Sequence, residues 1–545
     1  MKAISIFNDV LGPVMRGPSS SHTAAPYQIG RMARALLLGP AAEADDRLVE
    51  ATFVFDPGGS FAQGYREQGS DLGFAAGLLG WSLTDERFAQ VLDVAAAEGA
   101  ELTFSVEPLP SAPAAGREGA EPGQAEPLHP NTVDILLRSR RGRTLHAVAR
   151  SIGGGALVFT QVGGWPVWLT GDAQELLVEL EPAAVEPATA LLAPLLAREA
   201  PVPTRQEHAG RVLLHGRCAA APEAGLVAAL ESLPGVSAVW AAEAIFFPQR
   251  GAPIVGDAAE MVAYAEAEGC SLGQVALAYE AALLGLSPDE VLAETLRRFA
   301  VMRSAVQRGL GADPPPMQLL RPSARAVFQA EQEGRLAARG LHTRAAARAM
   351  AVMHVNGGMG VVCAAPTAGS AGTIPGVMVT LAEEGNGTPG SVPDERAIAL
   401  ALLAASAVGL VVAKRATFAA EVAGCQVEIG AAGAMAAAAV VEAAGGSARQ
   451  AVDAAAIAFQ NTMGLVCDMV QGIVEIPCHT RNAAAAANAF LCADLVLGGY
   501  HNPVPLDETV DAVMAVGQML PRELKVTALG GLALAPSARA LPRLR

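Results

Sequence analysis

The chain has 545 residues and a formal net charge of −16 at pH 7, from 38 basic and 54 acidic side chains. Its length predicts about two to four domains. Because 52% of the residues are hydrophobic and 17% are charged, a wholly disordered chain is excluded. The acidic balance argues against nucleic acid as a partner, since proteins neutralise phosphates with clustered cations.

Lysine is scarce, and only Lys2, Lys414 and Lys525 occur. A pyridoxal phosphate enzyme needs a lysine to form its Schiff base. Lys2 stands at the terminus and Lys414 ends an apolar run, and neither lies beside a glycine-rich phosphate loop. Pyridoxal chemistry is therefore not expected.

The sequence predicts neither export nor membrane insertion. The first residues lack the charged-then-apolar pattern and the cleavage site of a signal peptide. The longest uncharged apolar run, residues 397–413, is rich in alanine and just short of a membrane span, so a buried core helix is the better interpretation. Without a signal peptide, the seven cysteines are expected to be thiols or metal ligands and not disulfides. We expect a cytoplasmic protein that does not contact membranes.

In chain order, residues 1–202 mix helix-like and strand-like segments. GRMARALLLG at 30–39 predicts a helix, whereas ATFVF at 51–55 and the later TVDILLRS, TLHAVARSI and ALVFTQV predict strands. Residues 106–128 are crowded with Pro, Gly, Ala and Glu, which is typical of a solvated loop or insertion. We expect an α/β (α+β) domain.

Residues 203–262 form a short separate segment. RVLLHGR, EAGLVAALESL and VSAVWAAEAIFF predict a strand, a helix and a second strand. Two interpretations stay open for this segment. It is either a small ligand-sensing or docking module or a structured linker.

Strand signals fade over residues 263–545. SPDEVLAETLRRFAVMRSAVQRGL is apolar at helical spacing, and its Ser-Pro-Asp-Glu opening at 287–290 is a helix start. Runs such as AAGAMAAAAVVEAAGG let helices approach closely because alanine has little side chain. The second half is therefore predicted to be an Ala-rich all-α domain.

The first candidate for chemistry is the run GPSSSHT at residues 17–23. Its hydroxyls and backbone N–H groups suit an anionic group such as a carboxylate, and its histidine can move a proton near neutral pH. Serine and threonine also commonly begin helices. A helix N-cap is thus the alternative, which composition alone slightly favours. The residues concerned are Ser19, Ser20, Ser21, His22 and Thr23.

A second candidate is the HPNT run that contains His129 and Asn131, followed by SIGGG at 151–155. Glycines there permit positive φ and close approach of the backbone to a ligand. A lone His-Pro is usually an ordinary loop, so this signal is weak by itself.

A third candidate is APTAGSAGTIP at 365–375, which contains Thr367 and Gly369. A loop of small and hydroxyl residues that opens a helix can bind an anion through its N–H groups. It has neither the Gly-Lys-Ser/Thr of a phosphate loop nor a GxGxxG, so a nucleotide site is disfavoured.

The fourth candidate is a set of three cysteines, Cys425, Cys467 and Cys478, separated by 42 and 11 residues. These are not zinc-ribbon or ferredoxin spacings. Buried thiols in an Ala-rich core are the alternative, and we expect that role for the other four cysteines. Three thiolates from separate helix ends could also hold three irons of a cubane cluster and leave the fourth iron open as a Lewis acid.

Several long segments stand in one order along the chain. They are FNDVLGPVMRGPSSSHTAAP, HPNT, SIGGG, VVCAAPTAGSAGTIPG, EVAGCQVEIGAAGAMAAA, LVCDMVQGIVEIPCHTRNAAAAANAF and PLDETVDAVMAVGQMLPRELKVTALGGLA. The first three look like the β domain, and the last four like the α domain, of the iron–sulfur-dependent L-serine dehydratases (L-serine ammonia-lyases). This resemblance covers most of the chain apart from about residues 106–128 and 203–262.

The resemblance implies β and α domains fused in one chain and a [4Fe–4S] cluster held by Cys425, Cys467 and Cys478, with one iron lacking a cysteine ligand. It implies dehydration of L-serine through 2-aminoacrylate to pyruvate and ammonia. A homodimer is the family-level expectation, and residues 203–262 are then a divergent ACT domain. We expect proton transfer by His22 or His129 and substrate contacts from Ser19, Ser20, Ser21, Thr23, Asn131, Thr367 and Gly369.

Gln68 departs from the family's pattern. A Gly-His-Gly/Ala-Thr-Asp run usually follows a Gly-Ser-Leu/Phe-Ala stretch, whereas GSFA at 59–62 is followed here by EQGSD at 67–71. Glutamine cannot accept a proton as a base. One alternative is the same scaffold acting on another β-hydroxy or β-substituted amino acid. Another is a cluster-bearing paralogue without turnover, against which the intact serine run argues.

Overall fold

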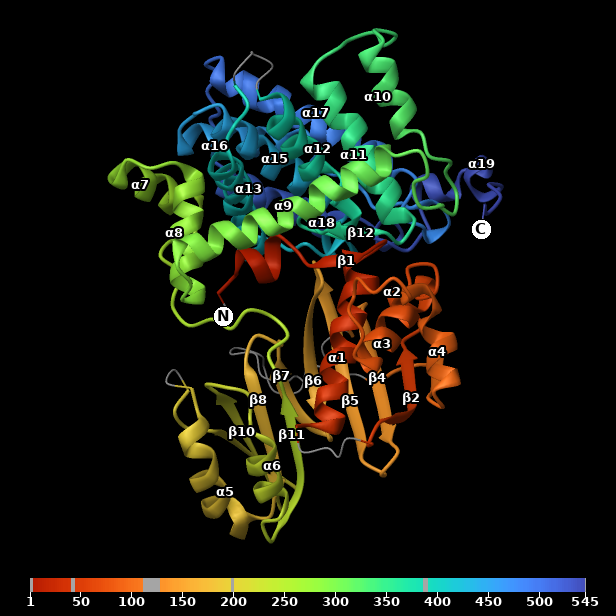
Figure 1. Cartoon of the computed structure of the whole chain (residues 1–545), viewed down its shortest axis with the longest axis vertical. Helices are drawn as coiled ribbons and strands as arrows, with labels where there is room; N and C mark the ends of the chain where they lie inside the picture. Colours follow the sequence, from red (N-terminus) through yellow and green to blue (C-terminus); the bar gives the residue numbers. More distant parts are fainter. Residues whose placement is uncertain (1–2, 41–44, 111–127, 198–199, 386–390, 545) are drawn as a thin grey trace.

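The computed structural model describes residues 3–40, 45–110, 128–197, 200–385 and 391–544. Its elements fall into three units, which we call the N-terminal unit (residues 3–172), the small unit (173–242) and the helical unit (258–544) (Figure 1). The mixed α/β first part and the helical second part confirm the predicted fold class. Most of the predicted insertion at 106–128 lies outside the described residues.

The N-terminal unit is built on a six-stranded sheet in the order β3-β2-β4-β5-β6-β7, in which only β2 and β3 run parallel. Helices α1 and α3 pack together beside it, and buried Phe53, Phe55 and Phe74 fill the space between helices and sheet. The helices are α1 (Ala25–Leu38), α2 (Ser60–Gly64), α3 (Ser70–Leu79) and α4 (Val91–Ala97); the strands are β2 (Leu48–Phe55), β3 (Glu101–Val106), β4 (Thr132–Ser139), β5 (Thr144–Gly153), β6 (Ala156–Val162) and β7 (Trp165–Leu169).

The small unit is a four-stranded antiparallel sheet in the order β11-β8-β10-β9. Its chain order is β-α-β-β-α-β, the split βαβ arrangement of ferredoxin-like folds. Side chains alternate along the strands: Leu176 and Val178 pack with the unit's own helices, whereas Leu177 joins the core of the N-terminal unit. Its elements are β8 (Gln174–Leu180), α5 (Val185–Leu192), β9 (Thr204–His208), β10 (Arg211–Cys218), α6 (Ala224–Glu231) and β11 (Val236–Ala242).

Strand pairing sets this unit's limits differently from the predicted boundary at residue 203. β8 is hydrogen-bonded to both β10 and β11 and therefore belongs to the small sheet, although it precedes that boundary. The segment after 203 also begins with a β9–β10 hairpin, where one strand was predicted. Local apolar patterning does not indicate which distant strand a segment pairs with, so the boundary depended on tertiary contacts. The ACT assignment stays a prediction.

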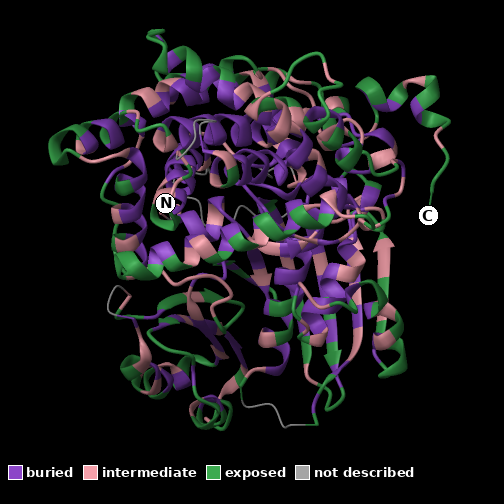
Figure 2. Cartoon of the chain, turned by 45° about the horizontal axis from the view of Figure 1, so that its top comes forward, coloured by how far each residue is buried: buried purple, intermediate pink, exposed green. Residues whose placement is uncertain are grey.

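The helical unit has an alanine-rich interior that is buried almost throughout (Figure 2). Its central helices α13 and α15 contact each other closely, and α15 packs on α16 and α17. The helices are α7 (Ala258–Glu268), α8 (Leu272–Leu284), α9 (Pro288–Leu310), α10 (Ala324–Gln332), α11 (Leu341–Gly357), α12 (Thr373–Glu384), α13 (Glu395–Arg415), α14 (Ala420–Ala423), α15 (Ile429–Ala443), α16 (Ala448–Gln460), α17 (Cys478–Leu497), α18 (Leu506–Met519) and α19 (Pro536–Arg539).

Two segments of the helical unit are long and apolar enough to cross a membrane, Glu395–Arg415 and Cys425–Ala443. Their apolar windows are 78% and 89% buried inside the protein. The run at 397–413 therefore forms a core helix, as predicted from its composition.

The first residues of the chain are fixed to the helical unit before the N-terminal sheet begins. Glu280 on α8, which is fully buried, accepts hydrogen bonds from Ser5 Oγ at 2.6 Å and from the N–H groups of Ile6 and Phe7 at 2.8 and 3.0 Å. Strand β1 (Val14–Arg16) then pairs antiparallel with β12 (Val361–Cys363). These contacts bring the run at 17–23 to the junction of the two units.

Candidate functional site

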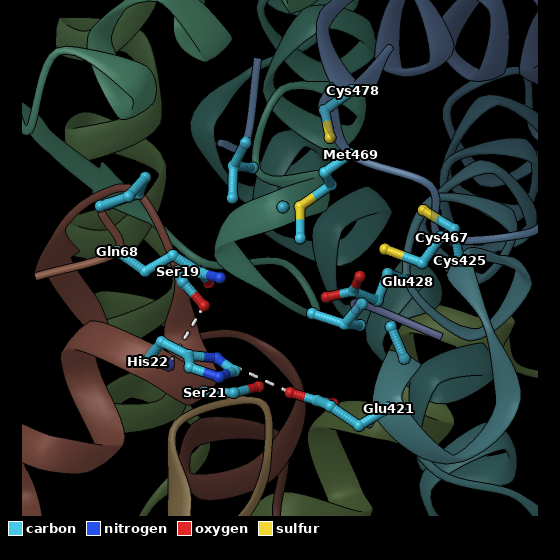
Figure 3. A pocket seen from close by; sticks show the side chains of 15 residues that line it. Ser19, Ser21, His22, Gln68, Glu421, Cys425, Glu428, Cys467, Met469 and Cys478 are labelled. Carbon is cyan, nitrogen blue, oxygen red and sulfur yellow. Dashed lines mark hydrogen bonds and ion pairs between the residues drawn. The ribbon is translucent and has the colours of Figure 1, made fainter. Parts of the chain in front are cut away.

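The three predicted cysteine ligands all line one pocket between the helical unit and the N-terminal unit (Figure 3). Cys425 follows α14, Cys478 is the first residue of α17, and Cys467 lies in the loop between α16 and α17. Each is at most 4% exposed. The sulfurs of Cys425 and Cys467 and a carboxylate oxygen of Glu428 lie within 4.8 Å of one another.

Buried polar contacts hold the loops that carry Cys425 and Cys467 together. Gln426 is fully buried, donates from Nε2 to the carbonyls of Ala423 at 2.9 Å and Val513 at 3.0 Å, and accepts from Gly464 N–H at 2.9 Å. Its own N–H donates to Leu465 O at 3.0 Å. One amide side chain thereby joins the Cys425 turn to the segment just before Cys467.

The protonation of the thiols depends on their burial and proximity. Burial raises the pKa of Cys478, and a hydrogen bond with the side chain of Cys425, together with burial, raises the pKa of Cys467 well above its ordinary value. That same bond lowers the pKa of Cys425. The sulfurs of Cys425 and Cys467 lie within 4.8 Å of each other, so a cation is needed to stabilise both as thiolates, and soft thiolate ligands select zinc, copper(I) or iron–sulfur clusters. Cys478 lines the same pocket, so the pocket offers soft sulfur donors of the kind that the predicted cluster needs.

The run at 17–23 forms a helix cap, and part of it also lines the pocket. Ser19 Oγ accepts from the N–H of His22 at 3.1 Å and caps the turn Ser20–Ala24 that leads into α1, as the N-cap alternative predicts. Ser19, Ser21 and His22 also line the pocket. Thr23 instead donates its hydroxyl to Gln68 O at 2.6 Å, and neither Thr23 nor Ser20 is among the lining residues.

His22 is the first member of a buried polar network. Its Nε2 lies 3.2 Å from Ser60 Oγ, and Ser60 Oγ donates to Asn131 Oδ1. Asn131 Nδ2 donates to Glu421 Oε1 at 3.1 Å, and that oxygen lies 3.7 Å from His22 Nδ1. Glu421 comes from α14 in the helical unit, so the network crosses between the two units.

His129 contacts this network but is not among the residues that line the pocket. Its Nδ1 accepts from the N–H of Asn131 at 3.2 Å. Burial lowers the pKa of both His129 and His22, and the nearby carboxylate of Glu421 opposes the shift in each case. A neutral imidazole is the form that can accept a proton, and of these two histidines only His22 lines the pocket.

The loop at 365–375 reaches the pocket only in part. Gly369 lines it, whereas Thr367 Oγ1 lies 3.1 Å from Ser370 Oγ. The N–H groups of Gly372 and Thr373 donate to Asn482 Oδ1 at 3.2 and 3.0 Å. An anion is therefore not expected to bind at these two amides, because a side chain from α17 already occupies them.

The empty space at the pocket, counted together with the open solvent at its mouth, is about 400 Å³. Ser19, Ser21, His22 and Gln68 lie on one side and the cysteines on the other (Figure 3). Gln68 is 3% exposed. Glu421 and Glu428 are lining residues that the sequence reasoning missed. The available signal was their place on either side of Cys425 in EVAGCQVE, as acidic residues in an otherwise small and apolar stretch.

Comparison with known proteins places the chain in a family. The family model "Serine dehydratase alpha chain" matches residues 266–533. The probable L-serine dehydratase alpha chain of Bacillus subtilis is 38% identical over 272 residues, which are 50% of this chain and 89% of that protein. The probable beta chain of the same organism is 35% identical over 178 residues, 33% of this chain and 69% of that protein. The L-serine dehydratase of Streptomyces coelicolor is 35% identical over 279 residues, 50% of this chain and 60% of that protein. The chain belongs to the L-serine dehydratase family.

Proposed function

We propose that this protein is an iron–sulfur-dependent L-serine ammonia-lyase that converts L-serine into pyruvate and ammonia. The observation that carries the proposal is the pocket shared by three buried thiols of the helical unit and the serine–histidine run of the N-terminal unit. Its relatives among the L-serine dehydratases support the substrate. The homodimer and the cytoplasmic location stay predictions.

Cys425, Cys467 and Cys478 would hold a [4Fe–4S] cluster, which supplies a Lewis acid for a substrate hydroxyl through the iron that has no cysteine ligand. The chain's own residues do the rest. Ser19, Ser21 and the amide of Gln68 are neutral polar groups on the opposite side of the pocket, suited to a carboxylate. His22, neutral because burial lowers its pKa, accepts the Cα proton.

The atoms balance as a loss of water. The Cα–H bond breaks and its proton goes to His22, a C=C bond forms, and the β-hydroxyl leaves with its bonding electrons. The 2-aminoacrylate that results becomes an imine, and water hydrolyses it to pyruvate and ammonia. The walls of the pocket, buried on both sides, limit the access of bulk water to the carbanion-like transition state.

The test is an anaerobic assay of the purified, iron-reconstituted chain with L-serine, measuring pyruvate, iron per chain and the visible spectrum. We expect pyruvate together with a cluster absorbance. A cluster without pyruvate contradicts the serine assignment, and full activity in an iron-free sample contradicts the metal chemistry.

A second candidate is a lyase on the same scaffold that acts on another β-hydroxy or β-substituted amino acid. It is favoured by Gln68, whose amide lines the pocket where the family resemblance leads one to expect a histidine. Gln68→His separates the two functions. A rise in serine turnover favours the serine enzyme, whereas no gain together with turnover of another amino acid favours the second candidate.

A further inference from the structure

Glu421 is a buried carboxylate with one oxygen engaged and the other without a partner. Oε1 accepts from Asn131 at 3.1 Å and lies 3.7 Å from His22 Nδ1. Oε2 is buried and has no hydrogen-bond partner, although the residue is only 9% exposed and lines the pocket. A buried carboxylate oxygen without a donor is unfavourable, so a donor that enters the pocket is stabilised there.

The lining of the pocket offers acceptor groups and no permanent cation among its described residues. Two carboxyl groups and three cysteines line it, and no lysine or arginine is among the lining residues that the structure describes. Arg481, whose charge acts on the thiols, is itself paired with Asp468 at 3.0 Å and donates to Val466 O at 2.8 Å. A ligand that brings its own positive charge is therefore the complement of this pocket.

The two carboxyl groups differ in position. Glu428 lies among the cysteine sulfurs, within 4.8 Å of two of them, where a metal would be held. Glu421 lies near His22, on the far side of Glu428 from Cys478 (Figure 3). Glu421 is thus the carboxylate that a substrate meets beside the proposed proton acceptor.

We propose that Glu421 binds the α-ammonium group of an amino-acid substrate through Oε2, while Asn131 holds Oε1. This assignment rests on the proposed lyase function and adds substrate selection to it. With the ammonium group on Glu421 and the carboxylate near Ser19 and Gln68, Cα lies beside His22. The pocket then discriminates against carboxylic and hydroxy acids that lack an amino group.

The experiment is calorimetric binding of L-alanine and propionate to the iron-reconstituted full chain under anaerobic conditions. L-Alanine has no β-hydroxyl and cannot be dehydrated, and propionate differs from it by the missing ammonium group. We expect the wild type to bind L-alanine at least about tenfold more tightly. Because a hydrogen bond to a charged group is lost, Glu421→Gln is expected to weaken L-alanine binding about 10- to 100-fold and to leave propionate nearly unchanged.

Glu442→Gln is the matched control. Glu442 is a half-buried carboxyl in the same unit that accepts hydrogen bonds from Ser271 Oγ and Gly273 N–H, and it is not a pocket-lining residue. We expect Glu442→Gln to leave the affinities for L-alanine and propionate unchanged. Equal affinities in the wild type, no detectable L-alanine binding, or an unchanged affinity ratio in Glu421→Gln overturns the assignment. If Glu421→Gln does not fold, Glu421→Asp replaces it: the shorter carboxylate must lower the ratio, and an unchanged ratio overturns the assignment.

Pyruvate formation by the wild type is measured separately with L-serine. Selective L-alanine binding without any pyruvate supports the Glu421 assignment and contradicts the proposed lyase. Pyruvate formation with the same KM for L-serine in wild type and Glu421→Gln overturns the Glu421 assignment and keeps the lyase.

Discussion

Replacing Gln426 with alanine is expected to weaken both the fold and the metal site. The substitution removes three side-chain hydrogen bonds: two that join the Cys425 turn to Val513 and to Gly464, and one within the turn to Ala423 O. Each such bond contributes about 0.5–1.5 kcal/mol net, so the loss of three lowers the free energy of unfolding by about 1.5–4.5 kcal/mol. The site is fully buried, and water therefore cannot replace the lost partners without opening the structure.

The local consequence is greater freedom of Cys425 relative to Cys467. We expect Gln426→Ala to hold less iron per chain after reconstitution and to unfold at lower denaturant concentration. Gln307→Ala, an exposed glutamine on α9, is the control and is expected to change the unfolding free energy by less than about 0.5 kcal/mol. The reasoning is refuted if Gln426→Ala keeps the wild-type iron content and the wild-type denaturation midpoint.

Three further predictions follow from the same geometry. Cys425→Ala, Cys467→Ala and Cys478→Ala each lose the brown cluster absorbance, whereas Cys218→Ala and Cys492→Ala keep it because neither lines the pocket; a normal spectrum in any of the first three contradicts the ligand assignment. Gly424→Ala destabilises more than Gly445→Ala in denaturant titrations. Both glycines have positive φ, +78° and +77°, but a Cβ at Gly424 would lie 2.7 Å from Leu520 Cδ1 and 3.0 Å from Leu465 O, whereas nothing lies within 4 Å at Gly445; equal losses contradict this. Burial lowers the pKa of His354 to about 4 in the folded protein, whereas the ordinary histidine pKa is about 6.5. As the pH falls below about 6.5, His354 takes up a proton in the unfolded chain before it does so in the folded protein, and the folded state loses stability. Between pH 7 and 5, His354→Gln should show a shallower fall in unfolding free energy than the wild type, and an identical slope excludes His354 as a cause.

Local patterns in the sequence were sufficient for the fold class. Helical spacing and a Ser-Pro-Asp-Glu start predicted the helix that the structure places at Pro288–Leu310, with Ser287 and Glu290 forming its capping box. The apolar run at 397–413 predicted a core helix, and it is one. Caps and periodicity act over a few residues, so the sequence displays them directly.

Residue types and motif order also determined the main parts of the site. The run at 17–23 and the three cysteines are recognisable in the sequence, and the structure brings Ser19, Ser21, His22 and the cysteines to one pocket. The sequence did not indicate which hydroxyls would be free. Thr23 is engaged by Gln68, and the amides of the loop at 365–375 are engaged by Asn482.

Only the tertiary structure decided the contacts between distant segments. Glu421 accepts a hydrogen bond from Asn131, which is 290 residues away in the sequence. β8 pairs with β10 and β11 and not with the strands that precede it. The position of Glu421 near Cys425 hints at the pocket but does not indicate Asn131 as its partner, and β8 resembles the strands before it. The sequence alone thus determined which segments are helix, strand and reactive loop, because those depend on neighbouring residues. Which side chains face one another was decided by packing, because burial and hydrogen bonding between remote segments depend on the whole fold.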